Sequence, residues 1–454
     1  MTRIIIIGGG AAGPKTAAKL RRTNSEYIID LYTEENVVSY SSCGLPYYIE
    51  GIIPDISELL VRSPSEFAKH GINIHLKQKC VKINKENRSV NIVNLETNEE
   101  FEEFYDILVI ATGARPYIPP IKNVDTGNVF TLRKLADGIN IKNAMRKAKR
   151  VTLAGCGFLG LELTEAFVKN GLEVNVVERE EHILSTFDDE FSERLKSVIE
   201  EHGNVKIHTN DTISRMISEN GNVKRVLTYN GKEIETDFAV ICAGVVPNSE
   251  LARQAGLKLG VGGSIKVNNH FKTSYPTIYA AGDCCEKLNI VTHDYCWLPL
   301  GSTANKEGRC AAMNIANEQC DFDGVTGAMV GKYFDFTASM TGISEKDASK
   351  AGFRPISATV TKPDRVGYMP GAAEITLKVT VDANSRRILG AQATGYGDAE
   401  KRISSITTAI TSGQNIDEFT NLDLPYAPPY SPAIDPILNA FQIISDKLDK
   451  RNFT

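Results

Sequence analysis

The same glycine-spaced loop occurs twice in this chain, and each copy lies between a β-branched run and a helix-forming stretch. The first copy reads IIIIGGGAAGPKTAAKLRR and the second reads VTLAGCGFLGLELTEAFVKNGLEVNVVERE. The spaced glycines are Gly8, Gly10 and Gly13 in the first copy, and Gly155, Gly157 and Gly160 in the second. In such a loop the first glycine permits a tight turn, the second lets the backbone approach a pyrophosphate, and the third lets helix and strand pack closely. The sequence therefore predicts two parallel-sheet units that each bind a dinucleotide.

An acidic residue follows the second strand of each unit, at the place where it would bind an adenosine ribose. Glu34 and Glu35 are the candidates in the first unit, and Glu178 is the candidate in the second. Two dinucleotides in one chain indicate a flavin nucleotide and a nicotinamide nucleotide, and therefore hydride transfer. Glu178 would repel a 2′-phosphate, which favours NADH over NADPH, although the neighbouring Arg179 would attract one.

Two further strand ends favour a flavin in the first unit. The run YDILVIATGARP leads into Thr112 and Gly113, where small residues allow the backbone to approach a ligand. The run TIYAAGDCCE leads into Gly282 and Asp283, where a carboxylate suits a polyol hydroxyl such as that of ribitol.

Composition excludes several other classes. A net charge of −5 over 454 residues gives no electrostatic reason to expect nucleic acid or an anionic membrane as a partner. Nine cysteines without a CxxC pair indicate neither a disulfide scaffold nor a zinc site, so no metal is expected and the cytoplasm is the expected compartment. The apolar run Ile4–Ile7 is too short for a signal sequence or a membrane span.

With these motifs, the sequence resembles the FAD-dependent pyridine nucleotide–disulfide oxidoreductases over nearly its whole length. It is most similar to their single-cysteine branch, which contains coenzyme A disulfide reductases, NADH oxidases, NADH peroxidases and NADH-dependent persulfide reductases. Besides the glycine loops, the resemblance rests on SYSSCGLPYYIEG (39–51), ATGARP (111–116), AAGDC (280–284), LPLGSTANKEGR (298–309), GYMPGA (367–372) and YAPPYS (426–431).

The resemblance implies an α/β fold with two Rossmann-like domains, for FAD and NAD, and an α+β C-terminal dimerisation domain. The expected boundaries are 1–119 and 248–326 for a discontinuous FAD-binding domain, 120–247 for the NAD-binding domain, and 327–454 for the dimerisation domain. Alternating runs such as EITLKVTVD after about Tyr333 agree with a third domain that lacks a nucleotide loop.

Cys43 is a lone cysteine, because no second cysteine follows within the CxxxxC spacing and the next is Cys80. Such a residue has no internal disulfide partner and must cycle through a mixed disulfide, a persulfide or a sulfenic acid. The resemblance implies that Cys43 lies near the flavin and passes electrons from NADH, through FAD, to a substrate. Because the thiolate is the attacking form, the site is expected to lower the pKa of Cys43.

Two tyrosines and one missing histidine distinguish members of the branch. Peroxidases and water-forming oxidases carry a histidine in the first glycine loop, where this chain has Ala11. Coenzyme A disulfide reductases carry two tyrosines that match Tyr368 and Tyr426. The resemblance implies that a homodimer forms and that each tyrosine pair reaches the partner's active site, where a phenol donates a proton to a departing thiolate.

A basic stripe on the first helix would meet the phosphates of coenzyme A. Lys15, Lys19 and Arg22 fall at i, i+4 and i+7 on one helix face. In the relatives this stripe acts together with positions that match Ser39, Ser42 and Asn305. Relatives also carry a lysine where this chain has Ile434, which leaves room for a smaller disulfide, persulfide or polysulfide.

The leading hypothesis is an NADH:disulfide oxidoreductase that uses Cys43, with coenzyme A disulfide as the best single substrate. The alternatives are an NADH oxidase, a persulfide or polysulfide reductase, and a flavin redox sensor with little turnover. By resemblance, the remaining cofactor-binding residues are Ala12, Ser42, Val81, Ala111, Phe158, Leu159, Gly244 and Ala304.

Overall fold

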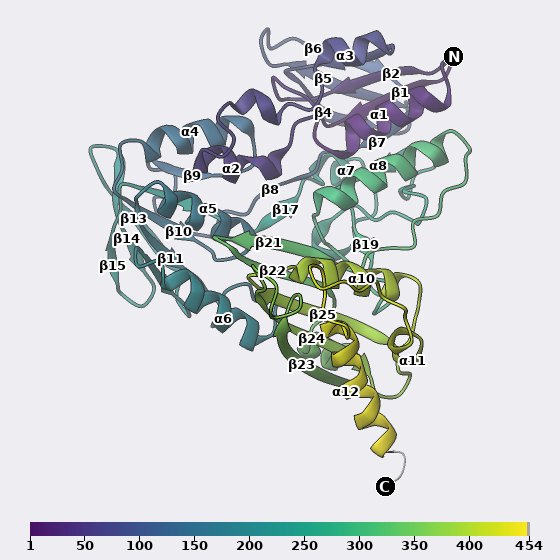
Figure 1. Ribbon diagram of the computed structural model, residues 1–454. Coiled ribbons are helices and arrows are strands. Elements are labelled where there is room, and N and C mark those ends of the chain that lie inside the picture. The colour runs from purple at the N-terminus through teal and green to yellow at the C-terminus, as the bar shows by residue number, and fades with distance from the viewer. Residues whose placement is uncertain (452–454) are drawn as a thin grey trace.

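The computed structural model describes residues 1–451 and shows three packed units (Figure 1). The first unit is built on a five-stranded parallel sheet with the order β18-β7-β1-β2-β3. Because β18 comes from a later part of the chain than the second unit, the first unit is discontinuous, and Figure 1 shows α7 and α8 in green beside the purple N-terminal elements. Its main strands are β1 (Arg3–Ile7), β2 (Ile28–Tyr32), β3 (Ile72–His75), β7 (Ile107–Ile110) and β18 (Ile278–Ala280).

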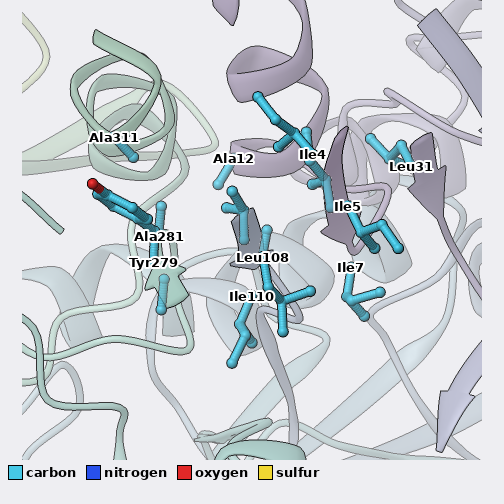
Figure 2. Packing of buried hydrophobic residues seen from close by; sticks show 14 of the residues in the cluster. Ile4, Ile5, Ile7, Ala12, Leu31, Leu108, Ile110, Tyr279, Ala281 and Ala311 are labelled. Carbon is cyan, nitrogen blue, oxygen red and sulfur yellow. The ribbon is translucent and has the colours of Figure 1, made fainter. Parts of the chain in front are cut away.

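Strand β1 is the middle strand of this sheet, and its four isoleucines are almost completely buried. A parallel strand covered on both faces is expected to be such a continuous apolar run. Figure 2 shows Ile4, Ile5 and Ile7 packed with residues of the neighbouring strands and with alanines of the covering helices. The helices and small sheet of this unit are α1 (Ala12–Thr23), α2 (Leu45–Glu50), α3 (Pro64–Lys69), α7 (Glu250–Gln254), α8 (Gly301–Ile315), β4 (Gln78–Asn84), β5 (Ser89–Asn94) and β6 (Glu100–Phe104).

The second unit repeats the parallel arrangement with the order β12-β11-β10-β16-β9. Short strands β8 (Ala114–Pro116) and β17 (Val245–Pro247) pair with each other where the chain leaves and re-enters the first unit. The other elements are β9 (Val129–Thr131), β10 (Arg150–Ala154), β11 (Glu173–Val177), β12 (Val205–His208), β13 (Ile213–Glu219), β14 (Asn222–Thr228), β15 (Glu233–Glu235), β16 (Phe238–Ile241), α4 (Leu135–Met145), α5 (Phe158–Lys169) and α6 (Asp189–Glu200).

The third unit is an antiparallel sheet with the order β21-β22-β25-β24-β23. The run EITLKVTVD forms β24, and helices α10 and α12 contact the sheet. Its elements are β21 (Met329–Tyr333), β22 (Phe336–Gly342), β23 (Pro355–Pro363), β24 (Glu374–Asp382), β25 (Ile388–Gly395), α9 (Glu345–Lys350), α10 (Ala399–Thr411), α11 (Ile416–Thr420) and α12 (Pro436–Arg451). The predicted α/β fold class, with two parallel-sheet units and an α+β C-terminal domain, is confirmed.

An ionic cluster joins the second and third units. The ammonium of Lys378 on β24 lies 3.0 Å from a carboxylate oxygen of Asp188, 2.8 Å from one of Glu190 and 2.9 Å from one of Glu345. Asp188 and Glu190 belong to the start of α6 in the second unit, whereas Glu345 begins α9 in the third. The side chains of Lys378 and Asp188 are both nine-tenths buried, so solvent screens this ion pair little, whereas Glu190 and Glu345 are partly exposed.

The two glycine loops have the same internal geometry. A Cβ on Gly13 would meet the carbonyl oxygen of Gly8, and a Cβ on Gly160 would meet that of Gly155, both far inside contact distance. A Cβ on Gly10 or on Gly157 would meet no atom within 4 Å. The third glycine of each loop is therefore required by the fold, whereas the middle glycine borders open space. Within residues 1–451, no helix has both the length and the apolar character needed to cross a membrane.

This difference predicts opposite outcomes for two neighbouring substitutions. Gly160→Ala is expected to lower the free energy of unfolding by about 1–3 kcal/mol, because the methyl group has to displace backbone. Gly157→Ala is the matched control and is expected to leave stability unchanged, because its backbone φ of −81° suits alanine and its surroundings are open. Chemical denaturation followed by circular dichroism measures both, and equal stabilities for the two variants would contradict the assignment.

Candidate functional site

Cys43 lies in a single 3₁₀ turn, Ser42–Gly44, that leads directly into α2. Gly44 donates its N–H to the carbonyl of Ser41 at 3.2 Å, and a side chain on Gly44 would collide with Leu59. Pro46 lies in the first turn of α2, where its missing N–H costs no helical hydrogen bond. The turn is thus fixed by local chemistry, and it leaves Cys43 as the one exposed cysteine of the nine.

The N-terminal end of α8 lies beside the Cys43 sulfur. A Cβ on Gly301, the first residue of α8, would be 3.9 Å from Sγ of Cys43. The first turn of this 15-residue helix contains no acidic residue. The unpaired N–H groups and the dipole at a helix N-terminus favour a thiolate over a thiol.

Side chains from the second unit also act on Cys43. Partial loss of solvent around the sulfur and the Glu162 carboxylate of α5 raise the pKa of the Cys43 thiol, and the Arg133 guanidinium only partly opposes them. The prediction that the site lowers this pKa is therefore wrong for the side chains of this protomer. The physical reason is that the carboxylate of Glu162 on α5 acts on the sulfur, although Glu162 is distant from Cys43 in the sequence.

The pKa of the Glu162 carboxyl group is itself shifted. Burial, followed by the nearby Glu165 carboxylate, raises the pKa of Glu162 to about 7. A carboxyl group poised near neutral pH next to a nucleophilic sulfur is typical of an active site rather than of a structural ion pair.

Asp283 provides an observation that fits a flavin. One of its carboxylate oxygens accepts a hydrogen bond from Arg133 at 2.8 Å, and its backbone carbonyl accepts one from the indole of Trp297 at 2.8 Å. The second oxygen, Oδ1, is buried and has no partner among the described residues. Since buried polar atoms are normally paired, this oxygen fits a ligand hydroxyl, as predicted for the polyol of FAD. The open space at Gly10 fits the pyrophosphate of the same group.

The two candidate acids after β2 already have protein partners. Glu34 lies 2.7 Å from the ammonium of Lys134 and 3.4 Å from that of Lys79. Glu35 accepts a hydrogen bond from the Tyr40 hydroxyl at 2.8 Å. Glu34 is the more exposed of the two, and its expected role toward the ribose stays a prediction.

In the second unit, Glu178 closes the glycine loop. Its carboxylate accepts hydrogen bonds from the backbone N–H of Cys156 at 2.6 Å and from that of Glu180 at 2.9 Å. Arg179 is 76% exposed and forms an ion pair with Glu180 at 2.6 Å. The guanidinium is thus partly neutralised, which supports the expected preference for NADH.

The other predicted cofactor residues surround these two loops. Ala111 and Ala304 are buried, and Gly113 and Gly244 have positive φ angles. The Thr112 hydroxyl donates to the carbonyl of Asn248 at 2.6 Å, which ties the end of β7 to the return of the chain. The remaining predicted residues lie at the ends of helices or on a strand. Ala12 starts α1, Ser42 starts the 3₁₀ turn, Val81 lies on β4, and Phe158 and Leu159 start α5.

The basic stripe lies on α1, but its members differ. Lys19 forms an ion pair with Glu318 at 2.8 Å, whereas no ion pair of Lys15 or Arg22 occurs among the described residues. Ser39 adopts a φ of 55° and donates its N–H to the carbonyl of Gly9, so it adjoins the first glycine loop. Asn305 is exposed on α8, one turn after Gly301.

Tyr368 and Tyr426 lie on two loops of the third unit, and both are exposed, at 74% and 52%. The loops are connected by a hydrogen bond from the N–H of Val366 to the carbonyl of Pro428 at 3.4 Å. Beneath them, the buried guanidinium of Arg402 donates to the carbonyl of Asp364 and pairs with Asp435 at 3.0 Å. The structure thus brings the two tyrosine loops together and leaves both phenols free to meet another surface.

Arg133 and Glu162 were missed by the sequence analysis. Glu162 follows the third glycine of the second loop by two residues, so its place early in α5 was a usable signal. Arg133 belongs to no motif, and only the tertiary structure brings it to Asp283.

Residues 2–308 match the pyridine nucleotide-disulphide oxidoreductase family, and residues 329–436 match the dimerisation domain of that family. The chain belongs to the pyridine nucleotide-disulphide oxidoreductase family. It is therefore an enzyme of the class that uses FAD and NAD(P)H, as the sequence predicted.

Three curated relatives match almost the full chain. It is 36% identical to the NAD(P)H sulfur oxidoreductase (CoA-dependent) of Pyrococcus furiosus, over 96% of this chain and 97% of that one. It is 32% identical to the NADH oxidase of Methanocaldococcus jannaschii, over 99% and 100%. It is 30% identical to the coenzyme A disulfide reductase of Staphylococcus epidermidis, over 95% and 97%.

Two solved structures match the fold of nearly this whole chain. The reduced CoADR-RHD protein of Bacillus anthracis superimposes with a TM-score of 0.96 at 35% identity, covering 99% of this chain and 81% of that one. The NAD-dependent persulfide reductase from A. fulgidus gives a TM-score of 0.96 at 37% identity, covering 99% and 84%.

The charge of Glu162 leads to a prediction about Cys43. Glu162→Gln is expected to lower the pKa of Cys43 and to speed its alkylation by iodoacetamide several-fold, because a negative charge beside the sulfur is removed. The gain should appear as pH rises through about 7, since Glu162 is protonated in the unsubstituted enzyme below that value. Glu50→Gln at the end of α2 is the control. An alkylation profile that Glu162→Gln leaves unchanged would show that this carboxylate does not act on the sulfur.

Proposed function

We propose that this enzyme is a FAD-dependent NADH:disulfide oxidoreductase with Cys43 as its one redox-active cysteine. The observation that carries the proposal is the position of Cys43, which is exposed and lies at the N-terminal end of α8, where the first and second units meet. The other eight cysteines are buried or partly buried. Cys43 is thus the sulfur best placed to meet a substrate.

The cofactors would be held by the two glycine loops. The first loop, Asp283 and the end of β7 would hold FAD, and the second loop and Glu178 would hold NADH. When bound, these groups supply two electrons as hydride equivalents. By this proposal the FAD-binding domain comprises residues 1–119 and 248–326, the NAD-binding domain 120–247, and the dimerisation domain 327–454.

Cys43 would do its chemistry as a thiolate. Its sulfur attacks one sulfur of the substrate disulfide, a mixed disulfide forms, and the other half leaves as a thiolate that takes up a proton. The two electrons from NADH then cleave the mixed disulfide, so one NADH, one proton and one disulfide give NAD⁺ and two thiols. The α8 N-terminus stabilises the thiolate in both steps.

The exposed phenols of Tyr368 and Tyr426 suit proton donation to the departing thiolate. They lie on the third unit, which matches the family's dimerisation domain. We therefore propose a homodimer in which these loops complete the partner's active site. The protein would work in the cytoplasm on a small thiol or disulfide.

Coenzyme A disulfide is the substrate that the basic stripe favours. Lys15 and Arg22 offer a point charge and a guanidinium fork for its phosphates. A persulfide or polysulfide is the second candidate, because the exposed Ile434 replaces a lysine that coenzyme A disulfide reductases carry. The names of the archaeal relatives agree with either sulfur substrate or with an NADH oxidase.

Replacing Cys43 tests the central step. Cys43→Ser is expected to retain FAD and its reduction by NADH, while disulfide reduction falls to below about one-thousandth of the original rate, because a hydroxyl does not form a mixed disulfide. Stopped-flow flavin reduction and steady-state turnover with a disulfide panel, with and without oxygen, measure both halves. Cys296→Ser is the control. Turnover that persists in Cys43→Ser would rule out the proposed mechanism.

The basic stripe gives a prediction about substrate size and charge. Lys15→Ala combined with Arg22→Ala is expected to raise KM for coenzyme A disulfide by about 5- to 150-fold, while KM for a small uncharged disulfide stays constant. Lys224→Ala combined with Lys258→Ala removes the same charge from exposed positions elsewhere and should change neither. Ile434→Lys should lower KM for coenzyme A disulfide. If the stripe variant treats both substrates alike, the stripe is only a solvated helix face.

A further inference from the structure

A completely buried ion pair lies beneath the proposed flavin site. The ammonium of Lys287 on β19 (Lys287–Leu288) lies 3.1 Å from a carboxylate oxygen of Glu307 on α8, and the side chains are 1% and 0% exposed. No other ion pair in the described part of the chain has both side chains so deeply buried. Burying two charges is costly, and apolar residues of similar volume often stabilise a core as well or better. The pair therefore calls for an explanation other than stability.

The two side chains hold the main chain of Gly282 on both sides, Glu307 through its N–H and Lys287 through its carbonyl. The second carboxylate oxygen of Glu307 accepts the backbone N–H of Gly282 at 2.6 Å. The Lys287 ammonium donates to the carbonyls of Gly282 and Cys285, each at 3.3 Å. The turn requires glycine at this position, because the φ of +93° is left-handed and a Cβ there would lie 3.0 Å from that of Ala12.

The residue that follows Gly282 is Asp283, whose Oδ1 is buried without a partner among the described residues. The carboxylate is held on its other side by Arg133 at 2.8 Å. The position of the unpartnered oxygen thus depends on the side-chain contact with Arg133 and on the main chain that Lys287 and Glu307 hold. Burial disfavours the charged form of Lys287, but the attraction of Glu307 outweighs it and raises the pKa of Lys287, so the ammonium persists at neutral pH.

We propose that Lys287 and Glu307 are positioning residues of the flavin site, which hold the main chain at Gly282 so that the free oxygen of Asp283 binds a polyol hydroxyl of FAD. The inference rests on the proposed function of Asp283 in that site. The pair acts on the cofactor only through the turn, and neither side chain needs to touch it.

The test measures the affinity for FAD rather than turnover. Lys287→Met alone leaves a buried carboxylate unpaired, so the main variant is Lys287→Met combined with Glu307→Gln, which removes both charges and keeps an oxygen for the N–H of Gly282. Apoprotein prepared from the full-length enzyme is titrated with FAD and followed by flavin fluorescence. We expect a dissociation constant that is about 10- to 100-fold higher.

A double-mutant cycle separates positioning from a general loss of stability. In an Asp283→Ala background, the same double substitution should raise the dissociation constant no more than about twofold, because the oxygen it positions is already lost. Arg3→Met combined with Asp30→Asn is the matched control, since it removes an ion pair at the other end of β1 in the same sheet and should leave FAD affinity unchanged.

Each other outcome overturns the inference in a distinguishable way. If the double substitution raises the dissociation constant for FAD by the same factor in both backgrounds, the ion pair supports the fold in general and not the position of Asp283. Weaker FAD binding in Asp283→Ala but not in the pair variant would refute the positioning role and leave the proposed flavin site standing. Unchanged FAD affinity in Asp283→Ala would refute both the positioning role and the proposed flavin site.

Discussion

Everything in this enzyme depends on how closely backbone approaches backbone at the two glycine loops. In both loops the third glycine lies against the carbonyl of the first, so helix and strand meet at a separation that no side chain permits. The middle glycine then borders open space at the N-terminal end of a helix, where N–H groups favour phosphate. The same arrangement fixes where the carboxyl ends of the strands lie. Other site residues, such as Thr112 after β7 and Asp283 after β18, come shortly after those ends in the chain.

The candidate active site is assembled from side chains that belong to different units. Cys43 comes from a loop of the first unit, Glu162 from helix α5 of the second, and Asp283 from the segment that returns to the first. Arg133 contacts Asp283 and also acts on Cys43, so it links the proposed flavin turn to the reactive sulfur. Tyr368 and Tyr426 face away into solvent, which gives the third unit a surface suited to a second copy of the chain.

Local features of the sequence predicted most of the fold, because glycine spacing, buried β-branched runs and capping chemistry act over a few residues. The two βαβ units, the lone Cys43 and the alternating strands of the third unit could all be found in this way. Interactions between distant residues could not. Arg133 carries no local signal, the effect of Glu162 on Cys43 arises only when α5 packs beside the 3₁₀ turn, and the ion pair of Lys19 with Glu318 spans 299 positions. The direction of the Cys43 pKa was missed for the same reason, since it depends on charges that sequence order keeps apart.

The cluster around Lys378 has a consequence for motion. Swinging the second unit away from the third would separate a nine-tenths buried ammonium from Asp188 and Glu190 at once, and would also break the hydrogen bond from the N–H of Asp188 to Gln392. Because Lys378, Asp188 and Gln392 are buried, salt does little to weaken the contacts among them. The second and third units are therefore expected to behave as one rigid arm, so that a nicotinamide nucleotide enters by rearrangement of loops and side chains at the mouth of the site rather than by a hinge.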